Sequence, residues 1–263
     1  MNRDLRALIA SAVVERDVDI LLLAECGVTD DEMSIALSTA TGKVYSALSE
    51  DSDKVRIFTR LNVASWTKRQ SDPVRARMAI WSVEAGRPPG ILLAVAHLVD
   101  RRNASEGEQA MLAVELGKEI DRAEMSIGHE RTLLVGDLNM NPFEDGVTGS
   151  LGLHAVMTMR IAERRARTVQ GTQRKFFYNP MWGLLGDRTV GAPGTFYHRK
   201  PGVIDVFWHM VDQVLLRPDL MASVHDLEIL DHIDEVNLLT AQAGIPSRTV
   251  ASDHLPLAFR LEL

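Results

Sequence analysis

The spacing of apolar and polar positions predicts three long helices. Apolar residues recur at helical intervals in residues 3–16 and again in residues 106–125. Thr29 and Glu32 have the spacing of a capping box, so we expect a further helix to begin there and to run through about Thr41. These helices are separated by segments of a different periodicity.

Short apolar runs between the helices predict strands, several of them buried on both faces. The predicted strands comprise residues 19–25, 43–48, 54–60, 75–84, 91–97, 131–135, 206–216 and 227–230, with a terminal strand inside 252–263. Residues 150–200 look irregular. Because no internal repeat, low-complexity tract or evident linker divides the sequence, we expect residues 1–263 to form a single α/β domain.

The composition narrows the class of protein. With 46% hydrophobic and 25% charged residues, the chain has the profile of a globular protein. Cys26 is the only cysteine, which excludes an intrachain disulfide, and no apolar run is long enough to span a bilayer. We therefore expect a cytoplasmic protein, with a monomer favoured. The net charge of −7 argues against a protein that coats nucleic acid through a basic surface, but it is compatible with a metal-assisted phosphodiester site.

Ionisable side chains gather at the ends of the predicted strands. They are Glu25, His97, Asp137 with Asn139, and Asp253 with His254, while Asp212 lies within a further strand. Taken singly, each has an ordinary structural explanation, such as a turn, an ion pair or a core histidine. Taken together, several buried carboxylates would cost several kcal/mol each without partners, and a divalent cation would offset that cost. Oxygen ligands suit Mg²⁺ or Mn²⁺ and not zinc.

These residues stand in five short motifs. The motifs are Leu-Ala-Glu25, Val-Ala-His97-Leu, Gly-Asp137-Leu-Asn139-Met-Asn-Pro, Val-Asp212-Gln-Val-Leu and Ser-Asp253-His254-Leu-Pro-Leu. In this order they resemble the endonuclease/exonuclease/phosphatase superfamily, which includes deoxyribonuclease I, the abasic-site endonucleases and the inositol-polyphosphate 5-phosphatases. The resemblance implies a four-layered α/β sandwich, with two mixed β-sheets packed face to face and helices outside. It also implies metal-dependent hydrolysis of a phosphate ester.

The resemblance further implies roles for the metal-binding and water-activating residues. Glu25 would be the principal Mg²⁺ or Mn²⁺ ligand, and Asp253 would assist it. Asp137 would orient and deprotonate the attacking water, and Asn139 would hold that water or a phosphate oxygen.

Two histidines would contact the phosphate or the leaving group, and an aspartate would position one of them. By the same resemblance, His254 would contact the scissile phosphate and would be positioned by Asp212, while His97 would contact the phosphate or the leaving group. A histidine paired with an aspartate keeps its proton to higher pH, as an electrophilic contact requires.

The start of the chain departs from the superfamily pattern. Most members begin with a strand that carries an Asn near the metal, whereas here the first helix begins directly after Met1 and Asn2. Asn2 is a candidate remnant of that motif. We therefore expect the usual first strand to be missing, either because the natural start lies upstream or because this member lacks it.

Four residues are candidate substrate contacts. They are Asn141, Tyr178, Asn179 and Trp182, and the last three follow an arginine-rich segment, residues 160–174. Basic residues followed by aromatics can track a phosphate backbone and stack on bases. A solvated helix face, with the aromatics in the core under a long loop, explains the same pattern equally well.

Three hypotheses for the function follow. The leading one is a Mg²⁺-dependent nuclease or phosphodiesterase with a DNA or RNA substrate. The alternative within the same fold is a phosphatase for a small or lipid-linked phosphate, such as an inositol phosphate. An inactive binding module is disfavoured because five catalytic positions are intact.

Overall fold

The computed structural model describes residues 3–48, 54–69, 77–86, 88–200 and 205–263; Asn2 and the start of the strand predicted at residue 75 lie outside this part. Its three long helices are α1 (Arg3–Glu15), α2 (Asp30–Thr41) and α3 (Glu106–Ile127), as predicted. Helix α2 begins at the capping box of Thr29 and Glu32 and ends at Gly42, whose left-handed backbone (φ 69°) closes the last turn.

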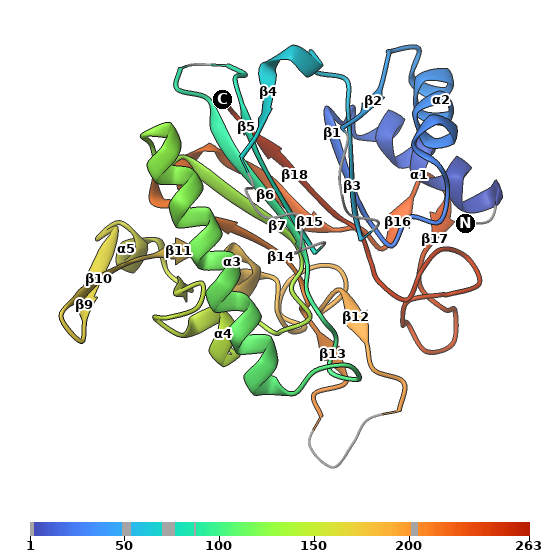
Figure 1. Ribbon diagram of the computed structural model, residues 1–263. Coiled ribbons are helices and arrows are strands. Elements are labelled where there is room, and N and C mark those ends of the chain that lie inside the picture. The colour runs from blue at the N-terminus through green and yellow to red at the C-terminus, as the bar shows by residue number, and fades with distance from the viewer. Residues whose placement is uncertain (1–2, 49–53, 70–76, 87, 201–204) are drawn as a thin grey trace.

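A seven-stranded mixed sheet forms the centre of the molecule (Figure 1). In spatial order its strands are β4 (Trp66–Lys68), β5 (Met78–Val83), β6 (Ile91–His97), β7 (Thr132–Asp137), β14 (Asp212–Leu216), β11 (Phe177–Tyr178) and β8 (Ala155–Val156). The pairs β6–β7 and β8–β11 are parallel and the others are antiparallel. Every residue of β5 and β6 is buried, which agrees with their continuous apolar sequence.

The second layer of strands is divided into two antiparallel groups. One is β1–β3–β2, with β1 at Ile20–Ala24, β3 at Val55–Thr59 and β2 at Ser46–Ala47. The other pairs β15 (Val224–Ile229) with β18 (Leu257–Leu261). The expected second sheet is thus present as a layer, but its described strands are all antiparallel and the two groups do not hydrogen bond to each other.

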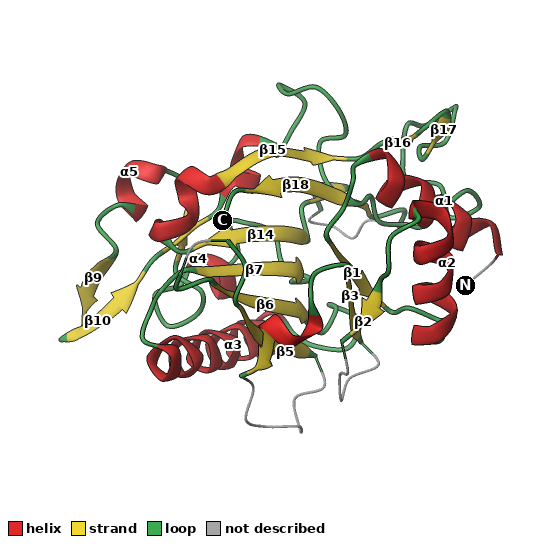
Figure 2. Ribbon diagram, turned by 90° about the horizontal axis from the view of Figure 1, so that it is seen from above, coloured by secondary structure: helices red, strands yellow, loops and turns green. Residues whose placement is uncertain are grey.

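Three apolar clusters separate the layers. The largest lies between the seven-stranded sheet and the second layer, and it includes Trp81 and Val95 on one side and Ile57 and Phe259 on the other. A second cluster packs α3 against the opposite face of the large sheet, and a third packs α1 and α2 against β1–β3–β2. Figures 1 and 2 show helices outside both layers of strands, so the predicted four-layered α/β sandwich is confirmed.

Short elements fill the segments between these layers. They are α4 (Asp145–Thr148), α5 (Met159–Ala162), β9 (Ala166–Val169), β10 (Thr172–Lys175), β12 (Phe196–Tyr197), β13 (Trp208–His209), β16 (His232–Ile233), β17 (Val236–Asn237) and the 3-10 turns η1 (Val63–Ser65), η2 (Pro180–Gly183) and η3 (Pro218–Ser223). The strand predicted at residues 206–216 is interrupted, so Asp212 begins β14 instead of lying in its middle. No helix in the described part of the chain is long and apolar enough to cross a membrane.

A buried ion network fastens α3 to the starting end of β7. Glu124 of α3 is 2% exposed and accepts hydrogen bonds from Thr132, Lys175 and Arg217 at 2.7–2.8 Å. Although burial raises the pKa of Glu124, the charge and hydrogen bonds of Arg217 outweigh it and lower the pKa. The carboxylate is therefore charged and fully paired, which makes this buried group structural.

Candidate active site

Three adjacent strands bring His97, Asp137 and Asp212 into one row. His97 ends β6 and is paired in parallel register with Asp137, which ends β7. Asp212 begins β14 and is paired with Asp137 in antiparallel register. Side chains at paired positions of neighbouring strands lie side by side on one face, with Cβ atoms about 4.5–5.5 Å apart in an antiparallel pair. The register alone thus assembles residues that are distant in sequence.

The turn after β7 fixes the direction of Asp137. Gly136 has φ 151°, and a Cβ atom at this position would overlap the carbonyl oxygen of Ala96 on β6. Asn139 has φ 52°, a left-handed conformation that Asn tolerates, and its backbone N–H donates to Asp137 Oδ1 at 2.8 Å. Its Nδ2 donates to Asp137 Oδ2 at 3.1 Å and to Leu98 O at 2.9 Å. The backbone N–H and one side-chain N–H of Asn139 therefore orient Asp137, and the other side-chain N–H fixes Asn139 to Leu98.

His254 joins the row from the loop before β18. Its Nδ1 lies 2.9 Å from Asp212 Oδ2, and one ligand atom from each of Asp137, Asp212 and His254 lies within 4.8 Å of the others. Phe196 of β12 packs on the imidazole with 4.9 Å between ring centroids and forms a β-bridge with His254. Thr195 Oγ1 accepts the backbone N–H of Asp212 at 3.1 Å. The Asp212–His254 pair is thus held from both sides.

Electrostatics divide these groups by protonation state. Burial alone would lower the pKa of His254, but the charges of Asp212, Asp137 and Asp253 outweigh it and raise the pKa to about 9. Burial and the charge of Asp212 raise the pKa of Asp137 to about 7. For Asp212, burial raises the pKa but the charge and hydrogen bond of His254 lower it overall. At neutral pH the site therefore combines an imidazolium–carboxylate pair with a carboxyl group near its midpoint.

His97 offers one ring nitrogen that the described residues leave without a partner. Its Nε2 lies 3.6 Å from Asp137 Oδ2, and burial lowers the pKa of His97, so the ring is neutral at neutral pH. Its Nδ1 is buried, and no described residue hydrogen bonds to it. Buried polar atoms are normally satisfied by the protein, by water or by a ligand. The imidazole therefore keeps one buried nitrogen without a hydrogen-bond partner among the described residues.

Glu25 and Asp253 border the group from two other elements. Glu25 directly follows β1, is exposed, and has φ 50°. Its negative charge contributes to the raised pKa of Asp137. Asp253 precedes His254 in the chain, and Arg248 pairs with its carboxylate. Burial raises the pKa of Asp253, but the positive charges of His254 and Arg248 lower it overall.

The charges of the site fit a divalent cation. The carboxylates of Asp137, Asp212 and Asp253 gather around the imidazolium of His254. Burial, together with the charges of Asp212 and Glu25, raises the pKa of Asp137. The donors are oxygens, which suit Mg²⁺ or Mn²⁺. Glu25 is exposed and is free of the Asp212–His254 pair, so its carboxylate is accessible to an ion.

Two predicted substrate contacts lie in the protein interior. Asn141 is 3% exposed, and its amide hydrogen bonds to Glu144 and to the backbone N–H of Met210. Asn179 has no exposed surface, donates to Gln213 Oε1 at 2.7 Å, and accepts the first N–H of η2. The structure therefore gives both amides a role in the fold instead of the expected contact with substrate.

The two aromatic candidates lie in different surroundings. Tyr178 pairs with Leu216 at the far end of β14 from Asp212 and packs on the central apolar cluster. Trp182 contacts the ring of Phe143, with 6.3 Å between centroids. The core alternative for these aromatics thus fits Tyr178, whereas Trp182 packs at the edge of the Asn139–Glu144 loop.

The arginine-rich segment lies at the opposite end of the sheet. Arg165 pairs with Asp219 and Glu130, which flank the starting end of β7, whereas Asp137 ends this strand. The strand separates the two ends by roughly 17 Å. The hairpin of β9 and β10 projects from the body of the molecule at this end (Figures 1 and 2). The segment therefore does not lie beside Asp137. A continuous track for a phosphate backbone that passes through the site would have to do so.

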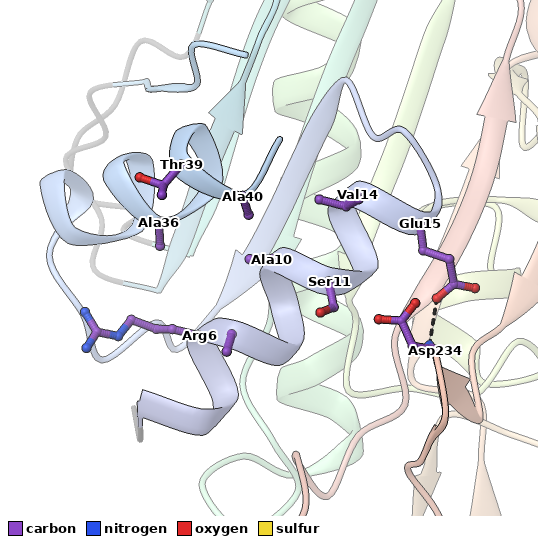
Figure 3. Close-up of a pocket in the computed structure, with 10 residues that line it drawn as sticks. Arg6, Ala10, Ser11, Val14, Glu15, Ala36, Thr39, Ala40 and Asp234 are labelled. Carbon is purple, nitrogen blue, oxygen red and sulfur yellow. Dashed lines mark hydrogen bonds between the residues drawn. The ribbon is translucent and has the colours of Figure 1, made fainter. Parts of the chain in front are cut away.

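A groove of 650 Å³ lies elsewhere, between α1 and α2 (Figure 3). Small side chains such as Ala10, Ser11, Ala36 and Ala40 line it, with Arg6 at one side. It contains none of the residues assembled around Asp137. The strand register and the charges, and not this groove, therefore locate the candidate site.

Comparisons with known proteins add a structural relationship. No family model matches the sequence, and no curated protein does. Solved structures do match. An endonuclease/exonuclease/phosphatase family protein from Leptotrichia buccalis has a TM-score of 0.58 at 10% identity, covering 100% of this chain and 96% of that one.

The chain has the endonuclease/exonuclease/phosphatase fold.

Two further structures with this fold carry an activity in their names. An AP endonuclease from Archaeoglobus fulgidus has a TM-score of 0.58 at 15% identity, covering 99% of this chain and 95% of that one. A 3′ phosphatase from Neisseria, bound to a product DNA hairpin, has a TM-score of 0.57 at 13% identity, with coverages of 97% and 93%. At these identities the likeness establishes the fold, which confirms the resemblance inferred from the motifs at that level.

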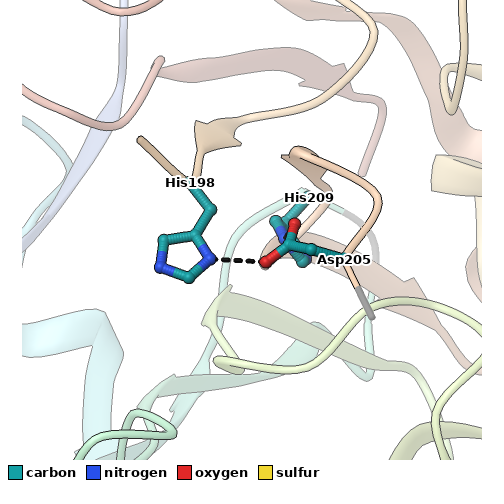
Figure 4. A group of neighbouring side chains, drawn as sticks. All are labelled: His198, Asp205 and His209. Atoms are coloured by element: carbon teal, nitrogen blue, oxygen red, sulfur yellow. Dashed lines mark hydrogen bonds and ion pairs between the residues drawn. The ribbon is translucent and has the colours of Figure 1, made fainter. Parts of the chain in front are cut away.

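Several residues of the site were not apparent from the sequence. Thr195 and Phe196 hold the Asp212–His254 pair, and Arg248 pairs with Asp253. A Thr-Phe dipeptide and a single Arg carry no motif signal, so their positions emerge only from the fold. The same is true of a cluster of His198, Asp205 and His209 beside Phe196 (Figure 4).

Proposed function

We propose that this protein is a metal-dependent phosphoesterase, and that its substrates are phosphodiesters of DNA or RNA. The observation that carries the proposal is the row of His97, Asp137 and Asp212 across three paired strands, with His254 bonded to Asp212. Hydrolysis of a phosphate ester needs a group that accepts a proton from water and positive charge near the phosphate oxygens. This row offers both within a few ångströms.

Asp137 is the proposed general base. Its pKa of about 7 suits a group that takes a proton from water as the water oxygen attacks phosphorus. Asn139 is a positioning residue, because its donors hold both carboxylate oxygens of Asp137. The new bond joins the water oxygen to phosphorus, and the ester bond to the leaving oxygen breaks.

His254 is the proposed electrophilic contact. With a pKa raised to about 9, it is an imidazolium at neutral pH and can stabilise the negative charge on a phosphate oxygen. Asp212 acts through His254 and not on the substrate, because its Oδ2 faces Nδ1 of that ring. His97 lies beside Asp137, with its Nε2 3.6 Å from Asp137 Oδ2, and would contact a phosphate or leaving-group oxygen.

Glu25 and Asp253 are the proposed ligands of Mg²⁺ or Mn²⁺. A bound divalent ion would supply Lewis-acid stabilisation of phosphate charge. The exposed carboxylate of Glu25 and the excess of negative charge support this assignment.

Nucleic acid is the proposed substrate class, and two structures with the same fold support it by name: an AP endonuclease and a 3′ phosphatase bound to a DNA hairpin. The alternative is a small or lipid-linked phosphate.

A substrate panel tests the proposal. Supercoiled plasmid, single-stranded DNA, an abasic-site duplex, a 3′-phosphorylated oligonucleotide and RNA are compared with inositol polyphosphates in Mg²⁺, in Mn²⁺ and in EDTA. We expect hydrolysis of at least one nucleic acid with either metal and none in EDTA. Turnover of inositol phosphates alone would favour the small-phosphate alternative. Turnover that is unchanged in EDTA would contradict the metal-dependent mechanism.

A further inference from the structure

A second aspartate–histidine pair lies beside the candidate active site. His198 Nδ1 lies 2.6 Å from Asp205 Oδ2, as Figure 4 shows. The ring of Phe196 packs on His254 with 4.9 Å between centroids and stacks on His198 with 6.4 Å between centroids. Phe196 and His198 are two residues apart in an extended segment, so their side chains share a face. Two aspartate-paired imidazoles thus neighbour one aromatic ring.

Asp205 is firmly held in place. Its side chain is 9% exposed, and the backbone N–H of Phe207 donates to its Oδ1 at 2.6 Å. His209 Nε2 lies 3.2 Å from the same oxygen. Burial raises the pKa of Asp205, but the hydrogen bonds from His198, Phe207 and His209 outweigh it and lower the pKa to about 2. Asp205 therefore remains a carboxylate that orients the imidazoles around it.

His209 has both ring nitrogens engaged, and this argues against a metal ion in the cluster. Asn141 Oδ1 accepts the N–H of Met210 and its Nδ2 donates to Glu144, which fixes the orientation of the amide. Nδ2 therefore also donates to His209 Nδ1 at 2.9 Å, so the proton of the neutral ring sits on Nε2 and faces Asp205. A metal bound at Nε2 would need this nitrogen deprotonated. His198, Asp205 and His209 are residue types that can bind a metal, but here they are arranged as a hydrogen-bonded group.

His198 differs from His209 because one of its nitrogens is available. Its side chain is 44% exposed, Nδ1 is directed at Asp205, and no described residue hydrogen bonds to Nε2. With its Nδ1–H donated to Asp205, the ring carries an Nε2–H only as an imidazolium, and in that form it can present this N–H to an anion. His254, whose Nδ1 faces Asp212, packs on the same Phe196 ring.

We propose that His198, oriented by Asp205, binds a second phosphate group of the substrate, next to the scissile phosphate held at His254. This inference rests on the proposed phosphoesterase function and narrows it to substrates that carry two neighbouring phosphates. A nucleic-acid strand and an inositol bisphosphate share this chemistry.

Two substrates that differ in phosphate number test the proposal. An oligonucleotide carries phosphates beside the scissile one, whereas the p-nitrophenyl ester of thymidine 5′-monophosphate has a single phosphate. For the oligonucleotide, His198→Ala should raise KM about tenfold or more, the scale of a lost charge-assisted hydrogen bond, with kcat nearly unchanged. For the single-phosphate ester, both constants should match wild type. His198→Gln keeps an N–H donor and should recover part of the loss.

A matched control comes from the same chain. His232 is exposed and also pairs with a carboxylate, Asp231, at 2.8 Å. His232→Ala should leave both substrates at wild-type KM and kcat. An inositol bisphosphate is the third substrate to be compared. If His198→Ala raises KM for the inositol bisphosphate alone, the contact with a second phosphate stands, but the substrate is a small molecule.

Other outcomes overturn the proposal. Equal losses on the one-phosphate and two-phosphate substrates would place His198 at the scissile phosphate, and no loss on any substrate would leave it without a substrate role. Stoichiometric Zn²⁺ binding, measured by calorimetry and abolished by His198→Ala, would make the cluster a metal site. If wild type hydrolyses no substrate, the proposed function fails, and the anisotropy of a fluorescent oligonucleotide then tests binding alone: equal Kd values for wild type and His198→Ala would refute the contact.

Discussion

Replacing Asp212 by Asn removes the charge that keeps His254 protonated while preserving the shape of the pair. The pKa of His254 rises from 6.5 to about 9, which corresponds to roughly 3 kcal/mol in favour of the imidazolium. Because its side chain is 31% exposed, solvent screening reduces this to about 2 kcal/mol. Asp212 makes the largest favourable contribution, ahead of Asp137 and Asp253. We therefore expect Asp212→Asn to lower the pKa of His254 by at least about one unit.

The sign of the effect follows from the direction of the shift. The folded-state pKa is raised, so the stability from this proton is fully present below pH 6.5 and is lost as the pH rises through about 9. In Asp212→Asn this loss should occur at lower pH. If the imidazolium stabilises phosphate charge, the alkaline limb of the pH–activity profile should shift to lower pH together with the pKa of His254.

The assay is a titration of the His254 ring resonances by NMR in metal-free protein, together with a pH profile of hydrolysis. Asp231→Asn is the matched control, because it removes the carboxylate beside the exposed His232 and leaves Asp212 in place. An unchanged titration of His254 in Asp212→Asn would refute the reasoning about the pair.

Three further predictions concern stability and the metal. Glu124→Ala should lower the free energy of unfolding, measured in urea titrations, by about 3–5 kcal/mol. The reason is that it leaves Arg217, which is 3% exposed, without its buried partner. A change below about 1 kcal/mol would contradict this prediction. Gly136→Ala should cost about 1–3 kcal/mol in thermal unfolding and reduce activity, because its Cβ would push β7 away from Ala96; wild-type stability would refute the close approach. EDTA should abolish hydrolysis and added Mg²⁺ or Mn²⁺ restore it, with circular dichroism unchanged; loss of the fold in EDTA would instead make the metal structural.

Local signals explain what could be predicted about the fold. Helix α2 begins and ends where the capping box and Gly42 place it, because these signals act within a few residues. Strands β6 and β7 were found because continuous apolar runs report burial on both faces. The division of the second layer could not be predicted, because it depends on pairing between strands far apart in sequence.

The candidate site was predictable where residue type and strand position coincide. Asp137 and His97 stand at strand ends, and the parallel register of their strands brings them together. The sequence does not distinguish Asn141 and Asn179 from Asp137 and Asn139, because all four are polar residues that follow apolar segments. Only the packing shows that the amides of Asn141 and Asn179 are consumed inside the protein. The single domain, the monomer and the cytoplasmic location stay predictions.

Hydrolysis by Asp137→Asn, compared with wild type in Mg²⁺, is the decisive test of Asp137 as the general base. The raised pKa of Asp137 means that its deprotonation destabilises the folded state increasingly as the pH rises from 3.8 towards 7. Asn removes that charge, so the variant should melt within a few degrees of wild type or above it. We expect it to lose at least about a hundredfold in kcat, as for a missing general base. Wild-type turnover by the folded variant would contradict the account.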